Sequence, residues 1–474
     1  MKSLFVLVSA FFIAAEVNAQ QLTTETPLVD KAFTLATKTL YKNAPDSLIK
    51  AGGQYGGEWT RDVSINAWNA ASLLIPEKTA YSLWSVTIDD RKLIGHQYWD
   101  QIIWVMAAYD FYLKNNDLNF LKQAYIASAN TMKKLEKEAY DEKYGLFTGP
   151  SVFNDGIAGY EEPIYEPTNK SSYVLDHPGS KTIKCLSTNC IYFRAYELLA
   201  DMARVLGDKK NIKEYKQKAS IQKENIRKYL YDKKQNRLNY LIDGNGKVHA
   251  YQEGLGISLA ILFQVVTPQE AKKIINGVYM GKYGLPSIYP AFKRFSKEHP
   301  GRHNQIVWPF VNGFWADACS KSGRDDIFMK EMMNLADLAI NKGNNCFYEI
   351  YNEDTGKVDG GWQQGGQWNS VYDQTWSATG YINMVFSGLL GMSFSTSGVT
   401  FAPNFKLMKD LGFKELKDLR YQMGTLDVKM VGTGSKLSTM LVNGVKYNLK
   451  KPIVATQGRT IIAVSYTHLT LPDE

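Results

Sequence analysis

The chain has 474 residues, of which 45% are hydrophobic and 22% charged, and its formal net charge is +8. This composition supports a large buried core and excludes an intrinsically disordered chain. The basic residues are scattered along polar helix faces and form no clustered stripe or known nucleic-acid module, so no nucleic-acid partner is expected.

The first 19 residues have the pattern of a secretory signal peptide. Lys2 supplies a positive start, residues 4–15 are apolar, and Val-Asn-Ala at 17–19 allows cleavage before Gln20. A membrane anchor is the alternative, but twelve apolar residues are too few to span a bilayer as a helix. We therefore expect a protein that is exported, periplasmic or secreted, without stable membrane insertion.

The four cysteines do not have the spacing of a zinc site. Cys185 and Cys190 lie close in sequence, and an oxidising compartment would permit a disulfide between them. The sequence leaves open whether they pair. Cys319 lies in an apolar helix and is expected in the core.

Helical periodicity dominates residues 28–392, where apolar residues recur at helical spacing. Thr267 and Glu270 form a capping box, and Gly207 is placed to end a helix in the left-handed conformation. Twelve helices with short links predict six hairpins, and a short motif repeated at Tyr140, Tyr231 and Tyr351 favours a recurring unit. The expected starts lie near residues 30, 62, 78, 97, 118, 187, 210, 252, 268, 304, 325 and 370.

Residues 144–181 interrupt this pattern, and a loop of this length with many Tyr, Pro, Asp and Glu residues favours a functional site. After residue 391 short alternating segments predict strands, and Asn443-Gly444 predicts a hairpin turn. We expect a signal peptide at 1–19, a helical catalytic domain at 28–392 and a small β-domain at 393–463. Residues 464–472 resemble a translated sequencing adapter, so 464–474 are treated as a potential artefact.

The first candidate site is the segment 56–62 (GGEWTRD), which opens a predicted helix. Thr60 as N-cap and an acidic residue in the first turn suit a helix start. A helix start requires neither the Trp nor the Arg, whereas a Trp face stacks on sugar rings and an Arg–Asp pair hydrogen-bonds neighbouring hydroxyls. We expect Trp59, Arg61 and Asp62 to bind a sugar.

Asp155 is the candidate general acid, in the long loop segment 148–156 (TGPSVFNDG). Asn-Asp-Gly by itself predicts no more than a turn. However, a glycosidic oxygen leaves poorly unless it is protonated, so a glycosidase needs a carboxylic acid with a raised pKa. Glu161 and Glu162 in the same loop are rivals for this role.

Glu349 is the candidate general base, in the run 347–351 (FYEIY). A carboxylate among apolar residues is costly to bury unless it has a partner or a task. An ion-paired structural glutamate is the alternative. Residues 352–356 (NEDTG) faintly resemble half of a calcium loop, so a structural calcium ion has little support, and no cofactor or other metal is expected.

Aromatic and amide side chains suited to polyhydroxylated ligands complete the candidate site. Aromatic residues at helical spacing are more often core residues, so none of them is decisive alone. The candidates for substrate binding are Trp99, Trp308, Trp362, Gln363, Gln367, Trp368 and Trp376.

These motifs resemble the six-hairpin glycosidases of the (α/α) toroid superfamily, and most of all glycoside hydrolase family 63-like and glycogen-debranching-type enzymes. The likeness covers about residues 30–450 and rests on four places: W-T-R-D at 59–62, N-D-G at 154–156, S-T-N at 187–189 and Y-E-I-Y at 348–351. It implies a mainly α (α/α) toroid with a small C-terminal β-sandwich.

The resemblance further implies an inverting glycosidase with Asp155 as acid and Glu349 as base, about 6.5–9.5 Å apart. An α-glucoside or glucan-derived oligosaccharide is the expected substrate, and a monomer the expected state. Many relatives have an N-terminal β-domain, whereas here the helices are expected to start almost at once, which leaves the aglycone side of the pocket, and so the substrate, open.

Three other functions stay open from the residues alone. A polysaccharide lyase would use Tyr or His as base, and His96 and His303 are available, although neither lies in a lyase motif. A glycoside phosphorylase would depend on phosphate and lack the base carboxylate. A non-catalytic glycan-binding protein would keep the aromatic residues and hydrolyse nothing.

Overall fold

The computed structural model describes residues 20–56, 59–432, 436–448, 450–454 and 457–467. The expected signal peptide at 1–19, Gly57 and Glu58 of the first motif, and residues 468–474 of the suspected artefact lie outside these ranges. Residues 464–467 belong to strand β21.

Six inner helices form a closed ring. Neighbours in the chain pack against one another in order, and the last helix, α13, packs against the first, α2. Their residues are buried on nearly all sides; every residue of α9 except Leu262 is buried. The inner helices are α2 (Thr60–Asn66), α5 (Trp104–Asn115), α7 (Leu186–Leu206), α9 (Gly254–Leu262), α11 (Pro309–Lys321) and α13 (Thr375–Asn383).

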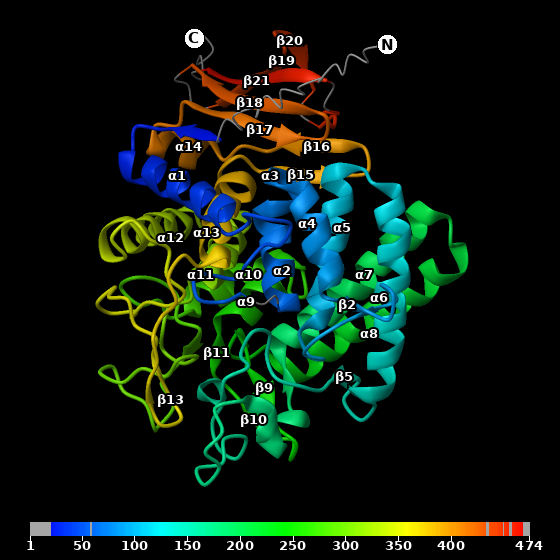
Figure 1. The fold of residues 1–474 in the computed structure, drawn as a ribbon, viewed down its shortest axis with the longest axis vertical. Helices are drawn as coiled ribbons and strands as arrows, with labels where there is room; N and C mark the ends of the chain where they lie inside the picture. The colour runs from blue at the N-terminus through cyan, green and yellow to red at the C-terminus, as the bar shows by residue number, and fades with distance from the viewer. Residues whose placement is uncertain (1–19, 57–58, 433–435, 449, 455–456, 468–474) are drawn as a thin grey trace, which may run out of the picture.

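The outer helices alternate with the inner ones along the chain and are amphipathic, as partly solvated helices should be. In α8, for example, Ala219, Gln222, Ile226 and Leu230 are buried while its lysines face outward. The architecture is therefore the predicted (α/α) toroid of six helical hairpins (Figure 1). The outer helices are α1 (Pro27–Lys42), α4 (Pro76–Ser85), α6 (Leu118–Glu138), α8 (Lys209–Leu230), α10 (Pro268–Gly277) and α12 (Asp325–Asp337).

Local signals placed most helix ends correctly. Thr267 and Glu270 form the capping box of α10, and Gly207 ends α7 with a φ of 76°. One detail differs. Trp59, not Thr60, precedes the first residue of α2, and the Thr60 hydroxyl instead donates to the Gly95 carbonyl at 3.0 Å.

Short antiparallel strand pairs connect many of the helices. The repeated motifs at Tyr140 and Tyr231 both begin such a hairpin directly after an outer helix, whereas the motif at Tyr351 does not. The strands are β2 (Thr87–Ile88), β3 (Leu93–Ile94), β4 (Tyr140–Asp141), β5 (Leu146–Phe147), β6 (Lys184–Cys185), β7 (Tyr231–Asp232), β8 (Arg237–Leu238), β9 (Leu241–Ile242), β10 (Val248–His249), β11 (Gln252–Glu253), β12 (Ile288–Tyr289), β13 (Trp362–Gln363) and β14 (Gly366–Gln367).

The C-terminal residues form the small β-sandwich, which covers one end of the ring (Figure 1). A six-stranded sheet of order β1-β17-β18-β21-β19-β20 faces the β15–β16 hairpin, and the predicted turn at Asn443-Gly444 joins β19 to β20. The sequence did not anticipate β1, which pairs with β17. The strands are β1 (Gln21–Thr23), β15 (Met392–Ser395), β16 (Gly398–Phe401), β17 (Glu415–Tyr421), β18 (Gly424–Val431), β19 (Lys436–Val442), β20 (Val445–Tyr447) and β21 (Gly458–Thr467).

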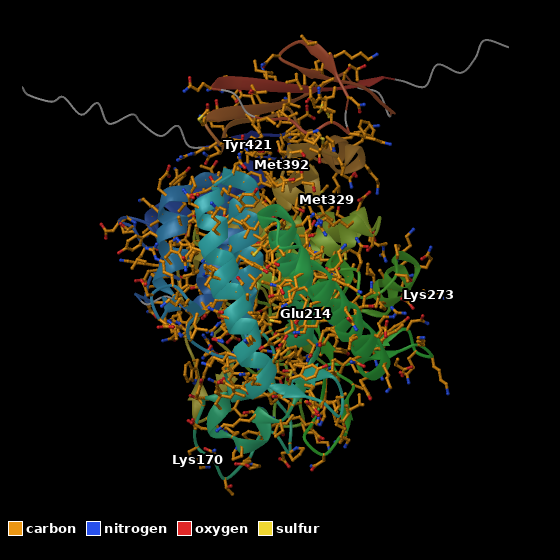
Figure 2. All side chains as sticks on the ribbon, turned by 90° about the vertical axis from the view of Figure 1, so that its right-hand side faces the viewer. Lys170, Glu214, Lys273, Met329, Met392 and Tyr421 are labelled. Carbon is orange, nitrogen blue, oxygen red and sulfur yellow. The ribbon has the colours of Figure 1, made fainter. Side chains whose placement is uncertain are left out.

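The two ends of the molecule differ. Met392 and Tyr421 lie where the helices meet the β-sandwich, and Lys170 of the long loop lies at the opposite end (Figure 2).

All four cysteines are free, so the disulfide that the sequence permitted between Cys185 and Cys190 is not formed. Both thiols are buried, and burial raises their pKa well above the ordinary value.

Candidate active site

A cavity of about 200 Å³ opens at the end of the ring away from the β-sandwich. The inner helices begin here: Trp59, Arg61 and Asp62 flank the start of α2, Trp308 precedes α11, and Trp376 lies in the first turn of α13. Loops supply the other walls, which are Tyr55, Phe153, Asp155, Gly156, Ser172, Tyr173, Arg302, His303, Glu349, Gln363 and Trp368.

Asp155 enters this cavity from the long loop. The backbone around it is fixed, because its carbonyl accepts from Val174 N–H at 2.8 Å and the neighbouring Asn154 Oδ1 lies 2.9 Å from His303 Nδ1. The next residue has little room for a side chain, because a Cβ on Gly156 would lie 2.1 Å from Gln363 Oε1 and 2.8 Å from His303, so these side chains would have to move. The loop thus holds one carboxylate, 31% exposed, at the cavity wall.

Arg61 binds this carboxylate and connects it to two more. Its guanidinium nitrogens lie 2.8 Å from Asp155 Oδ2, 3.4 Å from Asp100 Oδ2 and 3.5 Å from Asp62 Oδ2. Burial raises the pKa of Asp155, but the charges of Arg61 and Arg302 and the hydrogen bond from Arg61 outweigh burial, so the pKa lies below its ordinary value. In the unliganded site Asp155 is therefore ionised.

Asp62 has the opposite balance. Burial raises its pKa to about 7 despite the adjacent Arg61, and its Oδ2 has no hydrogen-bond partner within the part of the chain that the structure describes. A buried carboxyl oxygen on a cavity wall without a partner is poised to accept from a ligand hydroxyl.

Glu349 lies deeper than Asp155, with a side chain only 5% exposed. Arg302 Nη2 donates to its Oε2 at 2.6 Å, and Arg302 Nη1 is itself held by the carbonyls of Gly360 and Asn369 at 3.0 and 3.2 Å. Burial raises the pKa of Glu349, and Arg302 only partly opposes the shift. This glutamate is ion-paired and still faces the cavity, so the structural and catalytic roles that the sequence left open are compatible.

Aromatic rings complete the cavity. Trp308 packs on His303 with ring centroids 4.9 Å apart, and Phe310 stacks on Trp376 at 4.3 Å. Burial lowers the pKa of His303 to about 3, so this histidine is neutral. Trp368 is 41% exposed at the rim, under the guanidinium of Arg302.

The structure brings together Asp155, Glu349 and seven of the ten predicted substrate-binding residues. Three do not reach the cavity. Trp99 is fully buried in the core beneath the long loop, Trp362 faces a neighbouring cavity, and Gln367 is turned toward Asp359, to which it donates at 3.2 Å. The rival carboxylates also lie elsewhere; Glu161, for example, accepts from the Tyr251 hydroxyl at 2.7 Å.

Several wall residues were missed by sequence reasoning, above all Tyr55, Tyr173 and Arg302. Tyr55 directly precedes the 56–62 motif and Tyr173 lies in the long loop, but nothing in the sequence marks either side chain, and Arg302 has no motif around it. Among the described residues no group of three or more His, Cys, Asp or Glu side chains could hold a metal ion. In the calcium-like segment, Asn352 Oδ1 accepts two backbone N–H groups and Asp354 pairs with Lys297 at 2.9 Å.

The mannosylglycerate hydrolase MGH1-like glycoside hydrolase domain family matches residues 101–377, more than half of the chain. The chain belongs to this family. Family membership makes it a glycoside hydrolase of the six-hairpin, GH63-like type, and favours hydrolysis over the lyase, phosphorylase and non-catalytic alternatives. No curated protein matches the chain.

Solved structures share the fold at low identity. A GH63 mannosylglycerate hydrolase from Thermus thermophilus, in complex with Tris and D-glycerate, has a TM-score of 0.58 at 17% identity, covering 75% of this chain and 100% of that chain. A GH78 family rhamnosidase of Bacillus sp. GL1 has a TM-score of 0.56 at 13% identity, covering 94% and 44%. A sialidase reaches 0.64 at 12% identity, covering 85% and 38%.

Proposed function

We propose that this protein is an exported, inverting glycoside hydrolase of an α-glycoside, with Asp155 as general acid and Glu349 as general base. The observation that carries the proposal is that two carboxylates almost 200 residues apart in sequence face one small cavity, each paired with its own arginine. Inversion requires such a pair, one to protonate the leaving oxygen and one to activate water.

The surroundings of the two carboxylates support this division of roles. Asp155 is the more exposed one and directly precedes Gly156, Ile157 and Ala158, of which the last two line a neighbouring cavity of about 560 Å³. Gln363 lines both cavities. A sugar in the inner cavity would place its leaving group toward the outer one, beside Asp155, and leave the attacking water beside the enclosed Glu349.

The pKa directions of the unliganded site, taken alone, would favour the reverse roles. Arg61 keeps Asp155 ionised, whereas burial raises the pKa of Glu349. A bound sugar changes this balance when its hydroxyls take the N–H donors of Arg61, because Asp155 then loses its strongest partner and remains buried. We infer that Asp155 takes up its proton as the substrate binds.

The leaving-group dependence of two variants tests the assignment. Asp155→Asn should lose about 100-fold or more on a substrate with a poor leaving group and far less on a 2,4-dinitrophenyl glycoside, which needs no protonation. Glu349→Gln should lose activity on both. Glu162→Gln and Glu353→Gln, which change neighbouring carboxylates outside the cavity, are the matched controls. If Glu349→Gln is the variant that the activated substrate rescues, the roles are reversed.

The stereochemical outcome is a second test. Proton NMR during early hydrolysis should show the product sugar in the anomeric form opposite to that of the substrate. Retention would contradict the inverting mechanism whichever carboxylate is the acid.

For the substrate, an α-glucoside or glucan-derived oligosaccharide is our first proposal, and a mannosyl glycoside of a small hydroxy acid is the second. The second rests on the family name and on the charge of the outer cavity. The walls of the outer cavity carry Lys293, Arg294 and His299, and among the described residues that line it there is no Asp or Glu. Hydrolysis rates on mannosylglycerate, glucosylglycerate and maltose would decide between them. The neutral methyl mannoside and methyl glucoside are the controls for the two glycerates.

Export is also part of the proposal. Among the described residues, no helix is long and apolar enough to cross a membrane. Gln20, the residue after the expected cleavage point, is buried and anchored to the fold: its Nε2 donates to the Asp418 carbonyl at 3.2 Å, and its Oε1 accepts from the Tyr41 hydroxyl at 3.0 Å. Cleavage before Gln20 would therefore leave the described fold whole.

A further inference from the structure

A second cavity, of about 440 Å³, lies at the other end of the ring, where the inner helices end and the β-sandwich begins. Trp68 follows α2, Phe263 follows α9, Asp317 lies in the last turns of α11, and Phe394 comes from β15. The cavity shares no lining residue with the catalytic one. Its volume falls within the range of about 300–1,000 Å³ that is typical of ligand sites.

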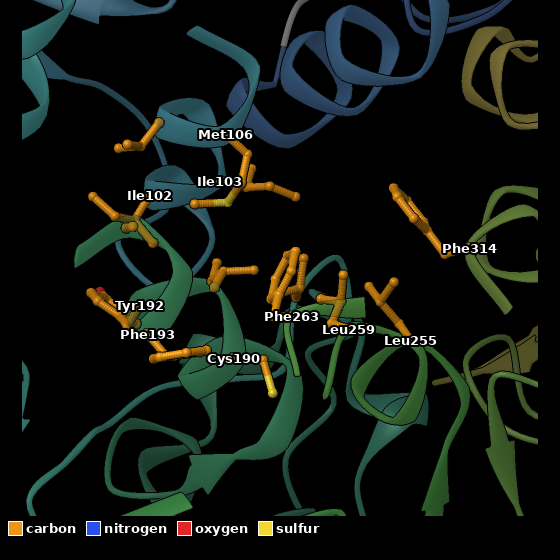
Figure 3. Close-up of a cluster of buried hydrophobic side chains, with 14 of the residues drawn as sticks. Ile102, Ile103, Met106, Cys190, Tyr192, Phe193, Leu255, Leu259, Phe263 and Phe314 are labelled. Carbon is orange, nitrogen blue, oxygen red and sulfur yellow. The ribbon is translucent and has the colours of Figure 1, made fainter. Parts of the chain in front are cut away.

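Aromatic faces form one side of this second cavity. Trp68, which is partly exposed, lies nearly parallel to Phe263, with centroids 6.0 Å apart and an interplanar angle of 19°. Phe314 packs against the same indole at 4.9 Å. Met106, Phe263 and Phe314 come from three different segments and belong to one buried cluster (Figure 3). An exposed indole backed by rigid rings is a suitable platform for the apolar face of a pyranose.

An unpaired amide lies beside this platform. Asn69 is only 2% exposed and lines the cavity, and its Nδ2 has no hydrogen-bond partner within the described ranges. Burying a donor without an acceptor costs about 1–3 kcal/mol, so a ligand or water oxygen is expected to complete it. The cavity therefore has an unsatisfied buried donor beside its apolar surface.

The charged groups of the cavity wall nearly cancel. Asp110 pairs with Lys114 at 2.7 Å, Glu197 with Arg194 at 2.7 Å, and Asp317 with Lys321 at 2.9 Å. Lys223 is the remaining cation among the lining residues. Each ion pair places a hydrogen-bond donor beside an acceptor, which suits the neighbouring hydroxyls of a sugar. Because the positive and negative charges nearly balance, the cavity does not favour a highly charged ligand.

From these observations we propose that the second cavity is a carbohydrate-binding site for a neutral mono- or disaccharide, separate from the catalytic cavity. The sugar ring stacks on Trp68, and one of its oxygens accepts from Asn69. This proposal does not depend on the roles of Asp155 and Glu349, since the two cavities have no residue in common.

Fluorine NMR of the full chain labelled with 5-fluorotryptophan tests the proposal at the level of the site. The Trp68 signal is assigned by its loss in Trp68→Phe, and methyl α-D-glucoside, methyl α-D-mannoside and maltose serve as probes. At least one sugar should shift the Trp68 signal saturably, and the shift should persist in a Trp308→Phe variant altered in the catalytic cavity. A Trp68 signal that does not move, or moves without saturation, would overturn the proposal.

Asn69→Ala provides the matched functional test. It should weaken binding at the Trp68 signal about tenfold or more while leaving the hydrolysis of an aryl glycoside and its KM unchanged. Lys223→Ala, which alters the rim without touching the buried amide, keeps the test valid if Asn69→Ala folds poorly, and should also weaken binding. Unchanged affinity in both variants would show that these walls do not hold the sugar.

Discussion

Two arginines decide the ionisation of the catalytic cavity. Arg302 makes a short pair with a carboxylate that is almost fully buried, and Arg61 is shared among three carboxylates. Removing one partner of a buried pair leaves the other charge uncompensated, which is more harmful than losing an exposed ion pair. Arg302 is therefore a positioning residue for Glu349, and its replacement should change the pH dependence as well as the rate.

Arg302→Met should lower kcat about 100-fold or more and move the acidic limb of the kcat/KM profile to higher pH. The sign follows from the pKa of Glu349, which burial raises and Arg302 lowers. A base must be ionised, so activity falls as pH drops through that pKa, and this occurs at higher pH without Arg302. Arg302→Lys should recover part of the rate, and Arg227→Met, which removes the remote pair with Glu270, should leave the profile unchanged.

Asp62→Asn should raise Tm at pH 8 and lower kcat/KM about 10- to 100-fold. The pKa of Asp62 is raised to about 7 in the fold, so the folded protein holds this proton more tightly than the unfolded chain does. Below about pH 4, its ordinary pKa, Asp62 is protonated in both states and hardly affects the stability of the fold. Above pH 7 it is ionised in both states, and its burial then destabilises the fold by the full amount. Thermal unfolding of both proteins at pH 4 and pH 8 measures the difference.

Asp326→Asn is the control for the opposite sign, because the hydrogen bond from Arg324 lowers the pKa of Asp326. Its carboxylate stabilises the fold at pH values above the ordinary pKa, and this stabilisation is lost as pH falls through the lowered folded pKa. Asp326→Asn should therefore reduce Tm slightly at pH 8. An Asp62→Asn protein that is less stable than the native one at pH 8 would contradict the energetic cost of burying this carboxylate.

Single residues could be recognised from sequence only where their chemistry was unusual for their surroundings. Glu349 in an apolar run and Asp155 in a long polar loop met that condition. Arg302 did not, since nothing near it in sequence indicates that it reaches a glutamate 47 residues away. Trp99 misled for the opposite reason: an aromatic residue beside an Asp fits a sugar site and a core equally well.

At the scale of elements, the long loop controls the geometry of the site. It carries Asp155 past His303 and Gln363, with little space for a side chain at Gly156. Its conformation depends on contacts with distant loops, such as the Asn154–His303 pair, which local sequence does not encode. The helices behaved differently, because apolar spacing, a capping box and a left-handed glycine are local signals, and they placed the expected starts within about seven residues.

Gly156→Ala should lower kcat/KM severely while the protein stays folded, because the new methyl group must displace Gln363 and His303 and so moves Asp155. Overpacking of this kind costs about 1–3 kcal/mol. Urea unfolding and kcat/KM on the same samples separate the two effects. Gly277→Ala, at the end of α10 with open space around it, should change neither, and an active Gly156→Ala protein would show that the loop tolerates movement.

At the scale of the molecule, the count of helical hairpins followed from the periodicity, whereas ring closure was expected only from the resemblance to (α/α) toroid enzymes. The packing of α13 against α2 joins segments about 300 residues apart and comes from geometry rather than pattern. The same holds for β1, which is too short for any sequence signal, and for the two cavities at opposite ends of the ring. Local sequence determines the individual helices, whereas packing between distant segments determines how they close into a ring and form the two cavities.

Export is a prediction about the whole chain. When the full sequence is produced in a Gram-negative host, the periplasmic protein should have the mass of a chain that begins at Gln20. Replacing Ala19 with Phe should block cleavage and leave the longer form attached to the membrane, whereas Ala15→Ser should not. A full-length chain in the cytoplasm would contradict the signal peptide.

The pairing of β1 with β17 has a consequence for synthesis. Gln21–Thr23 and the following helix α1 emerge from the ribosome long before their partners β17 and α13. This N-terminal segment therefore lacks its contacts with β17 and α13 until more than 300 further residues have been made. A ribosome that stalls before Glu415 would therefore release a chain in which β1 has no β17 to pair with.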